Sequence, residues 1–278
     1  MIVDIHTHAF AREHFTDKFL ADAQRARADV VKLLFTFEEY IEAMRPVDKA
    51  VVFGMKARRT GLYVPNEFIA DWVGRAPQKL IGFMSLDPTE EDFMDDFERS
   101  YHDLRLRGVK LGPIYAGFDP TDRRLDALYQ RCVKFNLPIL FHTGTSFVQF
   151  GPLAVTRPYL WDEVALRFPD LKIIMAHLAH PWEGECIAVI RKHPNVYADL
   201  SALYYRPWQF YNTMVLCQEY GVMHKLLFGS DFPFTTPQSS VEGIRALNRL
   251  VEGTNLPRLR EDVVEDIIHR DSLALLYA

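Results

Sequence analysis

The chain begins with the stretch MIVDIHTH at residues 1–8, an apolar run that ends in two histidines separated by one residue. Isoleucine and valine favour extended backbone, and side chains two residues apart in a strand project from the same face. His6 and His8 are therefore expected to project together from the C-terminal end of a strand. Two neighbouring imidazoles supply half of a four-ligand metal site. Because ten histidines are spread through the chain, the pair becomes significant only with the ligand-type residues at later strand ends.

Short apolar segments like this first one recur along the chain and alternate with segments of helical periodicity. Eight such strands separated by helices predict an α/β fold, a (β/α)8 TIM barrel, whose usual length is about 250 residues. One domain covering residues 1–278 is expected. A doubly wound open sheet is the alternative, but no Gly-rich phosphate loop follows the first strand. The predicted strands are Ile2–His8, Ala50–Gly54, Leu80–Leu86, Gly108–Gly112, Pro138–Thr143, Leu171–His177, Val196–Ser201 and Leu226–Asp231.

The segments between the strands carry signals of helix ends. Thr36 and Glu39 form a capping box that opens one helix, and Pro46 closes it. Thr121 is expected to cap a later helix that stops before Pro138. The interval between the first two strands is the longest and predicts an additional helical excursion over the mouth of the barrel.

The bulk composition excludes several classes of partner. Apolar residues make up 49% of the chain, charged residues 25%, and the net charge is -5, so a nucleic-acid partner is not expected. No apolar run approaches the length of a membrane span, and the N-terminal stretch lacks a basic leader, so we expect a cytoplasmic protein. The three cysteines are isolated among apolar residues and are expected to be packed thiols.

Metal-ligand types gather where the predicted strands end, which is where TIM barrels place their active sites. His6 and His8 end the first strand and Lys110 ends the fourth. Each of these residues alone has a structural explanation, but their coincidence at one rim does not. The remaining members are His142 after the fifth strand, His177 after the sixth and Asp231 after the eighth.

Burying this many polar groups is costly unless a partner satisfies them, and a divalent cation does so. Imidazole and carboxylate ligands suit zinc first, with manganese or iron as alternatives. A cation with an open position would lower the pKa of its water to about 7 and so supply a nucleophile. Asp231 would bind the metal, accept a proton from this water and pass it to the leaving group.

With these motifs in their order and spacing, the whole chain resembles the amidohydrolase superfamily, in particular its amidohydrolase-2 branch of metal-dependent hydrolases and decarboxylases. The resemblance includes Pro65-Asn66-Glu67, Leu86-Asp87-Pro88 and Gly229-Ser230-Asp231-Phe232-Pro233. It implies His6, His8, His142 and Asp231 as metal ligands. It implies His177 as a ligand of a second metal or as the group that polarises the substrate. A homodimer or homotetramer is also expected by this analogy.

The resemblance leaves two roles open for Lys110. In two-metal members of the superfamily, a lysine at the end of the fourth strand is carboxylated and bridges the ions, which requires a neutral amine. In one-metal members, a lysine there would pair with a substrate carboxylate. One or two ions per chain are therefore expected.

The substrate is expected to be a small molecule. Arg58 and Arg59 follow the second strand, where a guanidinium would meet an anionic substrate, although a solvated surface pair is an equal alternative. Asp4 alternates with the ligands and is expected to support a metal-bound imidazole. His180 would either reach the site or cap the following helix, and the helix cap is favoured. Aromatic residues expected to wall the pocket are Tyr115, Phe147, Trp182, Tyr204 and Tyr205.

The sequence favours a metal-dependent hydrolase that attacks a lactone, ester, thioester or amide of a small organic acid. A non-oxidative decarboxylase of an aromatic or unsaturated acid uses nearly the same ligands and is the alternative. A barrel that binds metal without catalysis is disfavoured, because storage alone does not explain an open mouth walled by aromatic rings.

Overall fold

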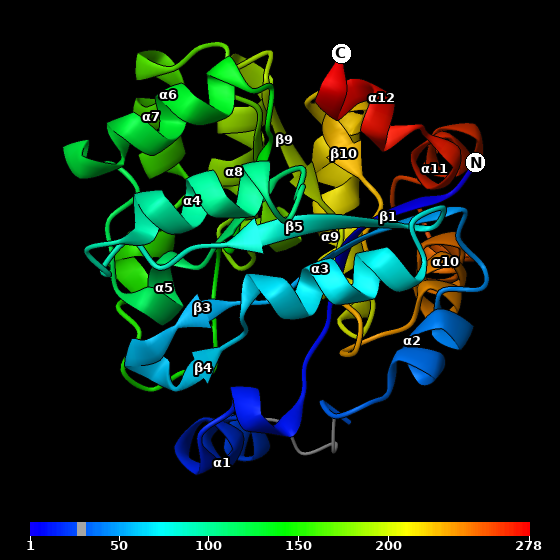
Figure 1. Cartoon of the computed structure of the whole chain (residues 1–278). Coiled ribbons are helices and arrows are strands. Elements are labelled where there is room, and N and C mark those ends of the chain that lie inside the picture. Colours follow the sequence, from blue (N-terminus) through cyan, green and yellow to red (C-terminus); the bar gives the residue numbers. More distant parts are fainter. Residues whose placement is uncertain (27–31) are drawn as a thin grey trace.

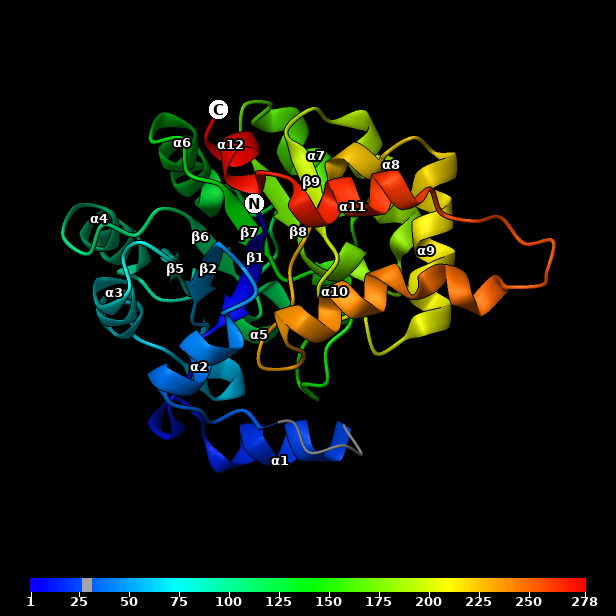
Figure 2. The ribbon, with the colours of Figure 1, turned by 90° about the vertical axis from the view of Figure 1, so that its right-hand side faces the viewer.

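In the computed structural model, which describes residues 1–26 and 32–278, parallel strands form a curved sheet surrounded by helices (Figures 1 and 2). Eight strands within these residues follow one another around the sheet in chain order. This confirms the predicted barrel, with each strand shorter than or equal to its predicted segment. The strands are β1 Val3–His8, β2 Lys49–Phe53, β5 Leu80–Ser85, β6 Val109–Leu111, β7 Ile139–Phe141, β8 Ile173–Met175, β9 Val196–Asp199 and β10 Leu226–Leu227.

The barrel closes between its first strand and the residues that follow its last. The amide of Ile5 donates to the carbonyl of Phe228 at 3.1 Å, and the amide of His8 donates to the carbonyl of Phe232 at 2.9 Å. Between them, the amide of Asp231 donates to the carbonyl of His6 at 2.8 Å. Two ends of the chain more than 200 residues apart are thereby joined at the C-terminal rim.

Apolar side chains fill the interior of the barrel below this rim. They form a cluster separate from the larger apolar layer between the strands and the helices. A barrel of eight strands is just wide enough to be packed by side chains, so the polar residues at its rim rest on an apolar floor. The interior cluster includes Val3, Ile5, Val51, Phe53, Phe83, Leu140, Ile174 and Leu227.

The helices cover the outside of the sheet, with a short hairpin, β3 Lys56–Ala57 and β4 Leu62–Tyr63, at the mouth. None of the described helices combines the length and apolar character required to cross a bilayer. The α-helices are α1 Asp17–Ala26, α2 Phe37–Ala43, α3 Asn66–Arg75, α4 Phe93–His102, α5 Pro113–Ala116, α6 Asp126–Lys134, α7 Tyr159–Arg167, α8 Glu183–Lys192, α9 Pro207–Glu219, α10 Pro237–Arg245, α11 Glu261–His269 and α12 Ser272–Tyr277.

The predicted helix cap at Thr36 is confirmed. The Thr36 hydroxyl accepts from the amide of Glu39, whose carboxylate accepts from the amide of Thr36 at 2.7 Å. The expectation for Thr121 is wrong, because its hydroxyl donates to Asp119 instead. Asp122 caps the short 3-10 turn that precedes α6.

The predicted excursion between the first two strands is confirmed in its described part. It contains α1, which lies apart from the ring of helices at the mouth of the barrel (Figures 1 and 2). Phe15 and Phe19 from this excursion turn their side chains into the barrel mouth, where they line a cavity. The excursion therefore contributes directly to the walls of the site.

Asn66 joins α3 to the end of β5. Its amide oxygen accepts from the backbone amide of Ser85 at 2.8 Å, and its amide nitrogen donates to the carbonyl of Ser85 and the hydroxyl of Ser100. The Asn66 side chain is fully buried. A buried side chain that satisfies backbone groups of a strand end stabilises the edge of the barrel mouth.

We predict that Asn66→Ala lowers the free energy of unfolding by about 2 to 3 kcal/mol, because it leaves the Ser85 amide and carbonyl buried without this partner. Urea denaturation measures the change. The matched control is Asn255→Ala at an exposed position, where we expect a change within about 0.5 kcal/mol. Equal effects of the two substitutions would contradict the bridging role of Asn66.

Candidate metal centre and active site

A β-bulge in β1 determines which of its side chains face the site. Asp4 pairs with Ala50 and Thr7 with Val52, so Ile5 and His6 together stand opposite the single residue Val51. An extra residue of this kind interrupts the alternation of faces along a strand. Asp4 and His6 are two residues apart, but because of the bulge their side chains do not lie on the same face of the strand.

Asp4 is a correction to the sequence prediction. Its carboxylate does not support an imidazole; one oxygen accepts the backbone amides of His6 at 3.1 Å and Ser230 at 3.0 Å. Burial raises the pKa of Asp4 to about 7, and these hydrogen bonds partly oppose that shift. Asp4 thus ties the bulge to the loop that carries Asp231.

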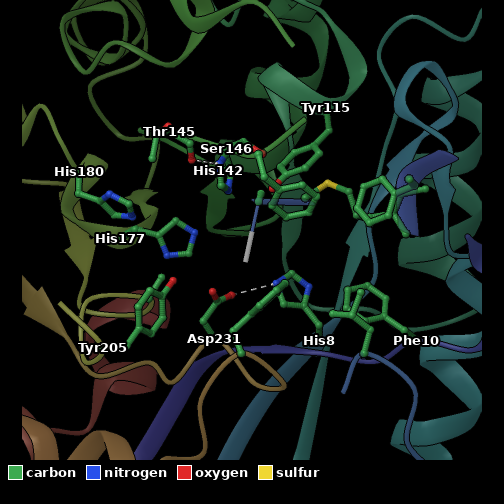
Figure 3. Close-up of a pocket in the computed structure, with 18 of the residues that line it drawn as sticks. His8, Phe10, Tyr115, His142, Thr145, Ser146, His177, His180, Tyr205 and Asp231 are labelled. Atoms are coloured by element: carbon green, nitrogen blue, oxygen red, sulfur yellow. Dashed lines mark hydrogen bonds and ion pairs between the residues drawn. The ribbon is translucent and has the colours of Figure 1, made fainter. Parts of the chain in front are cut away.

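Three of the predicted ligands meet at one point. The Asp231 Oδ1 atom lies 3.3 Å from Nε2 of His6 and 3.2 Å from Nε2 of His8. Figure 3 shows His8 and Asp231 facing each other across the floor of the cavity. All three side chains are buried, and their ligand atoms lie within 4.8 Å of one another. Two imidazole nitrogens and one carboxylate oxygen form a donor set that suits a divalent transition metal.

Asp199, at the end of β9, orients His6. The Nδ1 atom of His6 lies 2.8 Å from Oδ2 of Asp199, so it donates its proton there and keeps the Nε2 lone pair toward Asp231. The other oxygen of Asp199 accepts the backbone amides of His177 and Ser201, each at 3.0 Å. This is the carboxylate–histidine arrangement that supports metal-binding imidazoles.

Sequence reasoning missed Asp199 and Ser201. The signal was present, because Asp199-Leu200-Ser201 ends the predicted seventh strand in the same way as the chosen residues end theirs. His6, His177 and Asp199 form a second buried group of potential ligands. The seventh strand therefore contributes to the site as fully as the first.

His177 stands on an unusual backbone. The residues 177–179 all have positive φ, with 61° at His177, and Asp231 has a φ of 64°. Non-glycine residues in this region are sparsely populated and cluster at functional sites. Nδ1 of His177 lies 2.7 Å from the Ser201 hydroxyl, which itself donates to Asp199. Nδ1 of His177 is therefore the donor, and this tautomer leaves its Nε2 lone pair available, which favours the ligand role.

His142 lies one residue beyond β7, next to His177, with 5.1 Å between the ring centroids. Its Nε2 atom donates to the carbonyl of Thr145 at 3.1 Å, which leaves the lone pair on Nδ1. His142 lines the same cavity as His8 and Asp231 but belongs to neither group of three closely spaced ligand atoms.

Lys110 is fully buried within β6. Its Nζ atom lies 3.4 Å from Nε2 of His6. Burial lowers the pKa of Lys110 to about 7, although Asp199 and Asp231 oppose the shift. A substantial neutral fraction at neutral pH is what a carboxylated lysine requires.

The donors fit a cation in charge as well as in type. Burial lowers the pKa of His6, His8 and His177 well below the usual range, so these imidazoles are neutral at neutral pH. Neutral imidazoles are the form that binds metal. Nδ1 of His8 is buried and has no hydrogen-bond partner within the described part of the chain. The residues present therefore fit a divalent ion held between His6, His8 and Asp231.

Above these residues lies a cavity of about 280 Å³. Its polar lining gathers around His8, His142, His177 and Asp231, while its wall is rich in aromatic rings (Figure 3). Such a cavity accommodates a small molecule with an apolar body and a polar reacting end. The aromatic lining residues are Phe10, Phe15, Phe19, Tyr115, Phe147, Tyr205 and Phe234.

Three of the predicted substrate residues, Tyr115, Phe147 and Tyr205, line the cavity. The other predicted substrate residues do not line it. The Arg58 guanidinium pairs with Glu90 and lies 3.8 Å from the ring centroid of Tyr63, outside the cavity. Arg59 lies beside Gly117 and does not line the cavity either.

Tyr204 points behind the wall. Its hydroxyl donates to the carbonyl of Gly229 at 3.0 Å, and it is the adjacent Tyr205 that lines the cavity. Trp182 also lies outside the lining, with the guanidinium of Arg157 5.1 Å from its ring centroid. Adjacent residues in a loop face different ways, and residue order alone does not reveal which one turns inward.

The expectation that His180 caps a helix is wrong. α8 begins at Glu183 after Trp182, whereas His180 is buried and lines the cavity. The ring centroids of His180 and His177 are 6.2 Å apart (Figure 3). Residues 177–179 have left-handed backbone conformations, and these turn the chain back toward the barrel. Because none of the three is a glycine, the sequence does not indicate this turn.

We predict that Asp199→Asn weakens metal binding by about 10- to 100-fold, because the substitution removes the charged acceptor that orients His6. Competition with a chromogenic chelator measures the affinity. Asp170→Asn is the matched control on an exposed loop and should leave the affinity unchanged. If Asp199→Asn binds metal as tightly as this control, Asp199 does not support the metal centre.

Comparisons with known proteins give the family. The family model described as Amidohydrolase matches residues 3–276. No curated protein matches the chain significantly. Among solved structures, an uncharacterized TIM-barrel protein from Bordetella bronchiseptica is similar at 22% identity and a TM-score of 0.77, with 99% of this chain and 98% of that chain covered.

Two solved enzymes share the fold at lower identity. The 5-carboxyvanillate decarboxylase from Novosphingobium aromaticivorans, complexed with manganese and a nitrobenzoic acid, is 14% identical with a TM-score of 0.69, covering 100% of this chain and 96% of that chain. The probable 2-pyrone-4,6-dicarboxylic acid hydrolase from Acinetobacter baumannii is 13% identical with a TM-score of 0.62, covering 88% and 91%. The family match across the described barrel shows that this chain belongs to the amidohydrolase family and is an enzyme of that superfamily.

Proposed function

We propose that the protein is a metal-dependent hydrolase that cleaves an acyl bond of a small organic acid, such as a lactone, ester, thioester or amide. The observation that carries this proposal is the position of Asp231. Its Oδ1 atom contacts Nε2 of both His6 and His8, and the residue also lines the cavity. The same carboxylate is therefore placed both to hold a cation and to exchange a proton with a molecule in the cavity.

His6, His8 and Asp231 would hold the ion, with zinc as our first choice and manganese or iron as alternatives. A bound divalent cation polarises an acyl oxygen and lowers the pKa of water to about 7. Asp231 would accept a proton from the attacking water and return it to the leaving group. Its position is fixed by the hydrogen bond from its backbone amide to the carbonyl of His6. The aromatic wall would surround the body of the substrate with apolar surface.

His142, His177 and Lys110 complete the proposed centre. His177, through its Nε2 lone pair, and Lys110, if its partly neutral amine is carboxylated, would hold a second ion. His142 is oriented by its bond to Thr145 and would present Nδ1.

Non-oxidative decarboxylation is the second candidate, and the aromatic lining favours it. The ring of Phe10 stacks on His8 with 5.1 Å between centroids and an interplanar angle of 16°, and Tyr115 lies edge-on to His142 at 4.9 Å. A flat aromatic or unsaturated acid would fit between such rings. In that reaction the carbon–carboxylate bond breaks, carbon dioxide leaves, and a proton takes its place.

We predict that protein produced with zinc, manganese and iron available, and with bicarbonate present, binds about two ions per chain, and that Lys110→Ala binds about one. Elemental analysis gives the stoichiometry. Lys134→Ala, at an exposed position of α6, is the matched control and should match the parent. One ion in both the parent and Lys110→Ala would rule out the bridge and place the two reactions on equal terms.

We predict that Asp231→Asn lowers kcat/KM at saturating metal by about 10²- to 10⁴-fold, because the amide cannot accept the proton. A panel of lactones, esters, thioesters and amides of small acids is assayed for acid release, and aromatic carboxylic acids are assayed for carbon dioxide release. Asp170→Asn serves as the control. Carbon dioxide release without hydrolysis would replace the first candidate by the second, and turnover unaffected by Asp231→Asn would refute both.

A further inference from the structure

Arg206 brings a permanent positive charge to the cavity. It lies in the loop after β9, directly before Pro207 begins α9, and its side chain lines the cavity while remaining partly exposed. Arginine keeps its charge at every physiological pH. None of the strand-end or motif patterns indicated this residue, because it belongs to neither a predicted strand nor a recognised motif.

The guanidinium of Arg206 is oriented but not neutralised. One nitrogen, Nη1, donates to the carbonyl of Ala202 at 3.0 Å, and the group lies 4.5 Å from the ring centroid of Tyr205. Across residues 1–26 and 32–278, no carboxylate forms an ion pair with Arg206, whereas Arg58 and Arg157 each have one. A guanidinium has five N–H donors, so most of those on Arg206 are available to a ligand.

Charge is distributed unevenly over the cavity. The carboxylate in the described lining is that of Asp231, and its Oδ1 atom lies 3.3 Å from Nε2 of His6 and 3.2 Å from Nε2 of His8. Among the lining residues that the structure describes, Arg206 is the one arginine or lysine, so it carries the fixed positive charge. The same lining contains the aromatic wall, including Tyr205, whose ring centroid lies 4.5 Å from the guanidinium. A ligand that contacts the arginine, the rings and the metal ligands together has a flat apolar body and an anionic group separate from the reacting bond.

We propose that Arg206 binds a carboxylate of the substrate, so that the enzyme selects small acids with an aromatic or unsaturated body and a free carboxylate separate from the reacting bond. Tyr205 and the carbonyl of Ala202 position the guanidinium for this contact. Arg206 replaces Arg58 and Arg59 as the anion-binding residue. The identity of the substrate class rests on the proposed function of the site, but the carboxylate contact itself does not require turnover.

The test uses benzoate and its neutral counterpart benzamide as probes of the metal-loaded protein, with binding measured by titration calorimetry. Arg206→Gln is expected to weaken benzoate binding by about 10- to 100-fold, because it removes a charge-assisted contact, and to leave benzamide binding within about twofold. Arg206→Lys keeps the charge without the planar fork and should weaken benzoate binding to an intermediate degree. Arg58→Gln is the matched control and should bind benzoate like the parent.

Two results would overturn the assignment. Benzoate affinity that is unchanged in Arg206→Gln but lost in Asp231→Asn would place the carboxylate at the metal ligands. Equal weakening of benzoate and benzamide in Arg206→Gln and Arg206→Lys, with a lowered melting temperature, would make Arg206 a structural residue. The proposed function fails separately, if the activity panel shows neither acid release nor carbon dioxide release. The difference in benzoate binding between the parent and Arg206→Gln does not depend on that result.

Discussion

The closure of the barrel at its C-terminal rim is the constraint on which the site depends. The hydrogen bonds that join β1 to residues 228–232 are ordinary backbone bonds, yet they place Asp231 within 3.3 Å of both His6 and His8. Closing the sheet and assembling the proposed metal centre are thus one event. A change that opened this seam would separate ligands that come from opposite ends of the chain.

Burial then determines the chemical state of the assembled groups. Removing four imidazoles from water lowers their pKa, and the same effect brings the pKa of Lys110 to about 7. The carboxylate of Asp199 directs two of these imidazoles through its contacts with His6 and with Ser201, which orients His177. The positive φ values at His177 and Asp231 show that the backbone accepts unfavourable conformations where these side chains are presented.

The cavity combines three environments that suit one small substrate. Neutral ligands and a carboxylate form its floor, aromatic rings form its wall, and one arginine, Arg206, also lines it. The excursion that carries α1 contributes Phe15 and Phe19 to the wall, so the longest loop of the barrel shapes the substrate pocket rather than the chemistry. This division is usual for TIM barrels, in which loops vary while strand ends carry the reaction.

The sequence by itself determined the barrel, the strand order and the approach of His6, His8 and Asp231, because apolar periodicity locates strands and parallel strands bring their ends to one rim. It did not reveal that a bulge turns Asp4 away, that left-handed residues bring His180 inward, that Tyr204 points behind the wall, or that Arg206 lines the cavity in place of Arg58. Only the tertiary structure decided these, because the facing of loop residues depends on backbone angles and distant contacts that leave no periodic pattern in the sequence.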